Sequence, residues 1–144
     1  MGTVRRIFWD TMIHAYWFED HAKLSDRVQQ IYETMLQRGD VLCSSPFVLG
    51  EVLVGPLRTQ DFAAANMIQH FFESKEVTLF PFQPEAARTF AELRANHGLK
   101  SLDALHLASA SSAGVDLFLT YDRRLNKLTV PGIKFIVSLD TDLF

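Results

Sequence analysis

Short, mostly apolar runs recur along the chain, and segments with helical spacing separate them. These runs cover residues 4–9, 41–44, 77–82, 115–120 and 133–137. A strand with one wet face alternates polar and apolar residues, whereas a strand covered by helices on both faces is apolar throughout. The pattern therefore predicts an α/β domain, built as three α/β/α layers around a central parallel sheet of about five strands.

Capping residues and breakers mark the predicted helices between these runs. Helices are predicted over residues 11–21, 25–37, 46–54, 59–72, 84–96 and 101–113, with a turn or short helix over 122–128. The predicted N-caps are Ser25, Ser45, Thr59 and Ser101, because a hydroxyl can accept a hydrogen bond from a free helix N–H. The predicted stops are Gly39, Gly55-Pro56, Gly98 and Gly114. Apolar spacing turns two sets of side chains inward: Val28, Ile31, Tyr32, Met35 and Leu36, then Phe62, Ala65, Met67, Ile68, Phe71 and Phe72.

The length of 144 residues indicates one domain over residues 1–144, large enough to bury a core without disulfides. The single cysteine, Cys43, excludes an internal disulfide and is expected to be a buried thiol in a reducing compartment. No apolar run approaches the roughly 20 residues that span a bilayer. The apolar run within the first ten residues is too short for a signal peptide. The expected location is the cytoplasm, with no membrane partner.

The net charge of −3 differs from the basic balance of most dedicated nucleic-acid binders, but it does not exclude nucleic-acid binding. Basic side chains cluster locally at Arg5-Arg6, at Arg94 with Lys100, and at Arg123-Arg124 with Lys127. The ordinary interpretation of each cluster is a solvated face.

Four carboxylates stand at the edges of apolar segments: Asp10, Glu51, Asp103 and Asp122. Three of them have an ordinary structural explanation. Asp10 suits a helix cap, Asp103 the positive end of a helix dipole, and Asp122 a turn. Glu51 lies too far into its helix for either helix-end role, and its neighbours Val48 and Val52 to Val54 predict a buried helix.

Taken together, the four acids predict a metal site. Asp10 and Asp122 follow strands directly, and helices that follow strands begin at the same carboxyl edge of a parallel sheet. Asp103 and Glu51 are therefore expected to point into the same crevice. Carboxylate oxygens suit Mg²⁺ or Mn²⁺, so one or two such ions are the expected cofactors.

Four blocks of the sequence resemble the PIN-domain family. They are Asp10-Thr11 after the first strand, Glu51 in the helix after the second, KSLDALHLA at residues 100–108, and FLTYDRRL at 118–125 followed by Pro131-Gly132-Ile133. They cover essentially the whole chain in order, and the layout resembles the VapC-type toxin ribonucleases. Met12 departs from the small polar residue that the family often has there, which puts a contact around the metal site in doubt. Trp9 is also bulkier than expected.

The resemblance implies a metal-dependent endoribonuclease that hydrolyses RNA phosphodiesters and serves as the toxin of a type II toxin–antitoxin pair. It also implies an antitoxin partner and a homodimer. Asp10, Glu51, Asp103 and Asp122 would be the catalytic metal ligands. Positioning roles are expected for Thr120, Lys100, Arg123 and Arg124, with Thr120 orienting Asp122 or a water. His106 is expected to be a core residue.

Other functions remain open at this point. One is a PIN-fold RNA-processing nuclease that is not a toxin, and another is a catalytically idle binding module. A metal-dependent phosphatase of the haloacid-dehalogenase type would need a second acid where Met12 stands. A phospho-receiver domain would need adjacent acids in place of Trp9-Asp10, and an acceptor Asp where the third predicted strand ends in Phe80-Pro81-Phe82.

Overall fold

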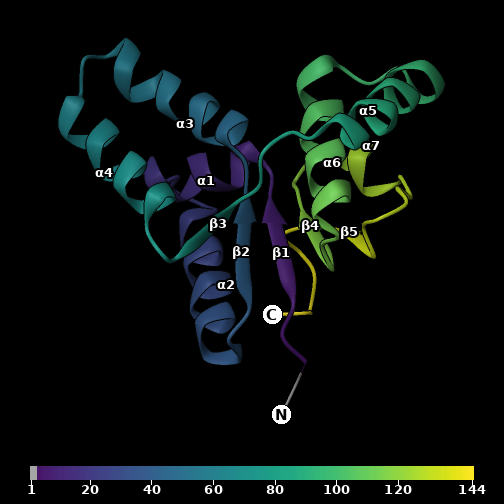
Figure 1. Ribbon diagram of the computed structural model, residues 1–144. Helices are drawn as coiled ribbons and strands as arrows, with labels where there is room; N and C mark the ends of the chain where they lie inside the picture. Colours follow the sequence, from purple (N-terminus) through teal and green to yellow (C-terminus); the bar gives the residue numbers. More distant parts are fainter. Residues whose placement is uncertain (1–2) are drawn as a thin grey trace.

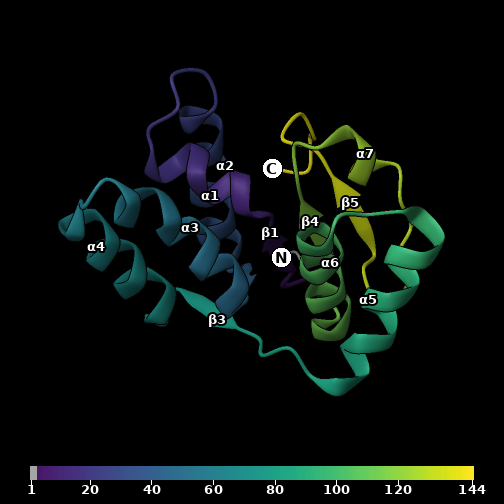
Figure 2. The same ribbon diagram turned by 90° about the horizontal axis from the view of Figure 1, so that it is seen from above.

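The computed structural model describes residues 3–144, and it confirms the predicted α/β class. The elements, in chain order, are β1 (Arg6–Trp9), α1 (Thr11–Phe18), α2 (Ser25–Arg38), β2 (Val41–Ser44), α3 (Pro46–Arg58), α4 (Phe62–Glu73), β3 (Val77–Leu79), α5 (Pro84–His97), α6 (Ser101–Ala113), β4 (Leu117–Leu119), α7 (Arg123–Asn126) and β5 (Phe135–Val137). The five strands form one sheet in the order β3-β2-β1-β4-β5, and every pair is parallel. Helices α1 to α4 group on one side and α5 and α6 on the other (Figure 1; Figure 2).

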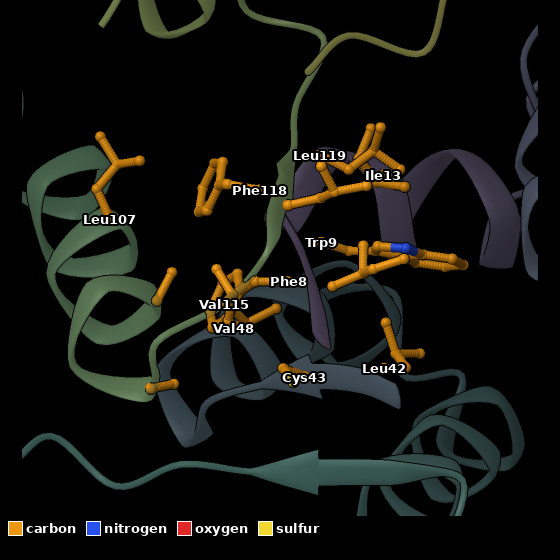
Figure 3. Close-up of a cluster of buried hydrophobic side chains, with 14 of the residues drawn as sticks. Phe8, Trp9, Ile13, Leu42, Cys43, Val48, Leu107, Val115, Phe118 and Leu119 are labelled. Atoms are coloured by element: carbon orange, nitrogen blue, oxygen red, sulfur yellow. The ribbon is translucent and has the colours of Figure 1, made fainter. Parts of the chain in front are cut away.

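The centre of the sheet is apolar on both faces, as the continuous apolar runs predict. Phe8 pairs in register with Phe118, and the next residues, Trp9 and Leu119, also pair. Because successive side chains of a strand point to opposite faces, Phe8 and Phe118 stack with ring centroids 5.4 Å apart on the side of α6. Trp9 and Leu119 lie on the side of Ile13 of α1, as Figure 3 shows.

The bulk of Trp9 serves the layer of α1 and α2. Its ring is fully buried and makes edge-on contacts with Trp17 of α1 at 5.6 Å and Tyr32 of α2 at 6.2 Å between centroids. The large side chain directly before Asp10 therefore points away from the pocket described below and into the core. Cys43 is also buried, as predicted, and burial raises the pKa of its thiol to about 11.

The predicted glycine stops are confirmed at Gly39, Gly98 and Gly114, each of which ends a helix in the left-handed conformation. Ser45 is confirmed as the cap of α3, where its hydroxyl accepts the N–H of Val48 at 3.2 Å. These ends are encoded locally, by a residue without a Cβ or by a short polar side chain beside free backbone groups.

Several predicted helix boundaries are wrong. Ser25 and Ser101 are first helical residues, one position past the caps Leu24 and Lys100. The stop predicted at Gly55-Pro56 does not occur, because α3 continues through Pro56 to Arg58. Proline has no backbone N–H, so it removes one hydrogen bond from the helix, which continues for only two residues beyond it. Thr59 ends α3, and Asp61 caps α4 by accepting the N–H of Ala64 at 3.1 Å.

Three side chains predicted to face inward are exposed instead: Leu36, Phe62 and Met67. The buried stripe of α2 consists of Val28, Ile31 and Met35, and that of α4 of Ala65, Ile68 and Phe72. Leu36 and Met67 are each one position from such a stripe, which turns them by about 100° around the helix and toward solvent. Phe62 is the first residue of α4 and is exposed at the helix end. No helix within residues 3–144 is both long and apolar enough to cross a membrane.

Candidate active site

The largest pocket described lies at the carboxyl edge of the sheet, where β1 and β4 end. It has a volume of about 820 Å³. It is lined by Asp10, Thr11, Met12, Tyr16, Glu51, Lys100, Ser101, Leu102, Asp103, His106, Thr120, Tyr121, Asp122, Arg123 and Arg124. All four acids singled out from the sequence are in this set, as are the four predicted positioning residues.

Asp10 forms the floor of the pocket and is the most buried of the four acids. It follows β1 and caps α1, and one carboxylate oxygen accepts the N–H of Thr11 at 2.9 Å. The other oxygen accepts the hydroxyl of Thr120 at 2.8 Å. Burial, helped to a smaller extent by the charges of Asp103 and Asp122, nevertheless raises the pKa of Asp10 to about 6 against the effect of these two hydrogen bonds. The surroundings of Asp10 therefore disfavour its ionised, negatively charged form.

Thr120 connects two of the acids. Its hydroxyl donates to Asp10 and accepts the backbone N–H of Asp122 at 3.1 Å. From the sequence, this hydroxyl is expected to orient Asp122 or a water. The structure shows a contact with the Asp122 backbone and a side-chain contact with Asp10, which the sequence did not predict. A fully buried threonine thereby fixes the carboxylate at the end of β1 from the end of the neighbouring β4.

Asp103 and Asp122 face the same cation, the guanidinium of Arg124. Arg124 lies 2.7 Å from an oxygen of Asp122 and 3.8 Å from an oxygen of Asp103. Asp103 stands in the first turn of α6, so the helix-dipole role considered from the sequence is real. Asp122, considered from the sequence as a turn residue, caps α7. Both residues also line the pocket, which these roles do not require.

Glu51 reaches the pocket from α3, but the prediction that it interrupts a helix buried on nearly all sides is wrong. Only Val48 and Val52 of α3 are fully buried, and Val54 is exposed. Glu51 is half-buried, and within residues 3–144 its carboxylate makes no hydrogen bond or ion pair. Its carboxylate is therefore available for a ligand.

His106 lies beneath the acids and is buried, as expected of a core residue. Its Nε2 is 3.2 Å from the hydroxyl of Thr11, within hydrogen-bond distance. Burial lowers the pKa of His106, while the charges of Glu51 and Asp103 act in the opposite direction. This dependence places both carboxylates near the ring and ties α3 and α6 to the same pocket.

The donor set suits a divalent cation, but it is not a preformed metal cage. Across residues 3–144, no three acidic, histidine or cysteine side chains converge closely enough to hold an ion by themselves. Oxygens of Asp122 are already engaged by Arg124. In favour of a cation are the carboxylate chemistry, the open Glu51 and the raised pKa of Asp10, which is caused mainly by burial and to a smaller extent by the charges of Asp103 and Asp122.

Beyond the eight predicted site residues, the pocket is lined by seven others, among them Met12, Tyr16 and Tyr121. In the sequence, Met12 stands out only as a departure from the family pattern. The signal for the first two is their spacing of four residues on a helix that starts at the strand end, since such residues share one face. Tyr121 carries no such signal beyond its position between Thr120 and Asp122.

The comparison with protein families matches the PIN domain over residues 7–131. The chain belongs to the PIN-domain family. The match covers strands β1 and β4, which Asp10 and Asp122 follow, and helices α3 and α6, which carry Glu51 and Asp103. The comparison with curated protein sequences finds no relative.

Solved structures share the PIN fold of this chain. VapBC2 of Rickettsia felis, bound to a DNA fragment from its promoter, has a TM-score of 0.73 at 17% identity and covers 92% of this chain and 98% of its own. DNA-bound VapBC of Salmonella typhimurium gives 0.72 at 16% identity, with 95% and 99% covered. VapC20 of Mycobacterium tuberculosis, a toxin that cleaves the sarcin-ricin loop, gives 0.65 at 20% identity, with 81% and 90% covered.

Proposed function

We propose that this PIN-domain protein is a metal-dependent endoribonuclease that hydrolyses RNA phosphodiester bonds and acts as the toxin of a type II toxin–antitoxin pair. The observation that carries the proposal is the gathering of Asp10, Glu51, Asp103 and Asp122 in one pocket at the carboxyl edge of the sheet. This edge is where open parallel sheets place their ligands.

The four carboxylates would hold one or two Mg²⁺ or Mn²⁺ ions. When bound, such an ion neutralises phosphate charge and makes water a better nucleophile at neutral pH. Thr120 holds the buried carboxylate of Asp10 in a fixed orientation through its hydroxyl. The burial of Asp10 makes its negative charge costly without a cation, which favours binding of a metal over an empty site.

The basic side chains of the pocket would position the RNA backbone. Lys100 stands at the start of α6, and Arg123 and Arg124 belong to α7. All three line the pocket beside the acids. Lysine and arginine contacts to phosphate set register and orientation without reading sequence, so these residues account for RNA binding by a chain of net charge −3.

RNA as substrate and an antitoxin as partner are supported by the structures that share the fold. One of them is described as a toxin that cleaves the sarcin-ricin loop, and others are VapBC toxin–antitoxin assemblies. A homodimer in the cytoplasm is part of the same proposal. A PIN-fold nuclease that is not a toxin would share the chemistry but would not arrest growth when expressed in bacteria.

The decisive experiment compares Asp103→Asn with Glu85→Gln. Both acids stand in the first turn of a helix, α6 and α5, so both substitutions remove the same favourable helix-dipole interaction. Only Asp103 lines the pocket. We expect the wild type and Glu85→Gln to cut RNA in Mg²⁺ or Mn²⁺ and not in EDTA, and Asp103→Asn to be inactive.

The proposal fails if Asp103→Asn cuts RNA like the wild type, or if EDTA leaves cleavage unchanged. Hydrolysis of a small phosphomonoester without RNA cleavage would support the phosphatase alternative instead. Growth arrest that Asp103→Asn abolishes would separate a toxin from a housekeeping nuclease.

A further inference from the structure

One wall of the acidic pocket is apolar. Met12 and Tyr16 are separated by four residues on α1, so they lie on one helix face, and both line the pocket. Met12 is 50% exposed although it is a large apolar residue. Exposure of an apolar surface to water is energetically unfavourable, and such surfaces in soluble proteins often mark binding sites.

Tyr121 extends this wall from the loop between β4 and α7. Its ring centroid is 6.3 Å from that of Tyr16 at an interplanar angle of 88°, an edge-to-face contact. The ring of Tyr16 is braced from another side by His21, with centroids 5.1 Å apart. Tyr121 is 42% exposed, so the inner ring is held in place and the outer ring is presented to solvent.

The aromatic wall lies close to the acids. Tyr16 has its pKa raised chiefly by burial, and also by Tyr121 and by the charge of Asp10. Tyr121 lies directly between Thr120, which holds Asp10, and Asp122. A nucleotide whose phosphate reached the carboxylates would therefore have its base or sugar within reach of these rings.

The charged wall comes from other elements. Lys100 begins α6, and Arg123 and Arg124 belong to α7, whereas Met12 and Tyr16 belong to α1. Helices α1 and α6 stand on opposite sides of the sheet (Figure 2). Tyr121 directly precedes the segment from Asp122 to Arg124, so an aromatic surface suited to a base adjoins a cationic surface suited to phosphates. This pairing of stacking platform and basic groove is how proteins bind unpaired nucleic acid.

We propose that Tyr121, braced by Tyr16, stacks on the base of an unpaired nucleotide adjacent to the phosphodiester that is cut, while Met12 covers the apolar side of that nucleotide. The inference rests on the proposed ribonuclease function and deepens it, because it assigns the base-binding residues and the substrate class. A base inside a duplex is already stacked on its neighbours, so the preferred substrate is RNA with splayed-out bases.

The test is a cycle between protein and RNA variants. The probe is a single-stranded RNA of about ten nucleotides, in a series that carries one abasic nucleotide at successive positions. Asp103→Asn is the background, so that the RNA is bound without being cut. In this background we compare Tyr121→Ala, Tyr121→Phe and, as an exposed aromatic outside the pocket, Phe62→Ala.

We expect Tyr121→Ala to weaken binding by roughly 5- to 100-fold, the range for loss of one base–aromatic stack. Tyr121→Phe retains the ring and should stay near the parent, as should Phe62→Ala. At one abasic position the loss from Tyr121→Ala should disappear, because the stacking partner is already absent. The same sequence annealed into a duplex should bind more weakly and be insensitive to Tyr121→Ala.

Equal losses for Tyr121→Ala on intact and on every abasic RNA would overturn the proposal, since the residue would then have only a structural role. Equal losses for the Ala and Phe variants would overturn it as well. If the wild type binds and cuts RNA while Tyr121→Ala behaves identically, the stacking assignment alone fails. If the wild type neither binds nor cuts RNA, the proposed function fails together with it.

Discussion

Arg124 binds the carboxylate of Asp122 through two nitrogens of its guanidinium. Its Nε donates to one carboxylate oxygen at 3.1 Å and its Nη2 to the other at 2.7 Å. This hydrogen bonding is the main reason that the pKa of Asp122 lies below its usual range. The same Nη2 is 3.8 Å from Asp103. A protein cation therefore contacts two carboxylates that the proposed function assigns to a metal, so metal and guanidinium compete for them.

Removal of Arg124 should strengthen metal binding. We expect Arg124→Ala to raise the affinity for Mn²⁺ by about two- to five-fold, the scale of an exposed ion pair. Isothermal titration calorimetry without RNA measures this directly. Arg123→Ala is the control, because it removes the same charge from the same pocket, and Arg123 makes no ion pair with Asp103 or Asp122 within the described residues. Equal affinities for the two variants would show that Arg124 does not compete with the metal.

Asp10→Asn should stabilise the metal-free protein at neutral pH. The folded state raises the pKa of Asp10 from 3.8 to about 6, so the ionised carboxylate costs stability as pH rises through this window. The cost above pH 6 is up to about 3 kcal/mol. Asparagine still caps α1, and the Thr120 hydroxyl can accept from its amide. Urea unfolding in EDTA should show the gain at pH 7.5 and little at pH 4. The control Asp142→Asn, at an exposed position, should show no gain in stability at pH 7.5. A loss of stability for Asp10→Asn at pH 7.5 would refute the electrostatic argument.

The sheet and the edge where the acids gather could be predicted because they depend on local signals. Continuous apolar runs identify the strands, and parallel strands put their ends on one edge, so Asp10 and Asp122 had to lie on the same edge. Their closeness depends on β1 and β4 being neighbours, and this strand order was not predicted. Asp103 lies in the first turn and Glu51 in the second turn of helices that start at this edge, so both stay near it. That the four side chains hold a metal stays a prediction.

The partners of these acids could not be predicted, because they depend on how side chains meet across elements. Nothing in the sequence distinguishes Arg124, which binds Asp122, from Arg123, which does not. The bond from Thr120 to Asp10 joins residues 110 positions apart. The exposure of Tyr121 depends on the direction of a loop. The misplaced caps at Ser25 and Ser101 have a different cause, since adjacent residues compete for one helix end and sequence preference does not resolve a single position.

Gly132→Ala should destabilise the fold more than Gly39→Ala. Both glycines have positive φ, 93° and 76°, where an L-residue pays about 1–2 kcal/mol. A Cβ at Gly39 would meet nothing within 4 Å, whereas one at Gly132 would lie 2.6 Å from the backbone oxygen of Ser111 at the end of α6. That clash should add roughly 1–3 kcal/mol, the usual cost of overpacking. Urea unfolding of both variants measures the difference, and equal losses would mean that the chain around Ser111 yields freely.

His14→Met should protect the fold against acid. The imidazole of His14 is fully buried beside Phe72 and Trp9, at 4.8 and 5.1 Å between centroids, and neither of its nitrogens has a hydrogen-bond partner among residues 3–144. Burial, with a smaller contribution from the charge of His106, lowers its pKa from 6.5 to about 3. Below pH 6.5, His14 is therefore protonated in the unfolded chain but stays neutral in the folded protein. The free energy of unfolding consequently falls as pH decreases toward 3.

The loss at His14 amounts to about 2 kcal/mol at pH 5, at 1.36 kcal/mol for each pH unit below the unfolded pKa. Methionine fills a similar volume, is apolar and does not titrate. The difference in unfolding free energy between His14→Met and the wild type should therefore grow steadily from pH 7 to pH 5. The exposed His97→Met should show no such growth. A constant difference across this range would mean that the folded protein protonates His14 as readily as the unfolded chain does.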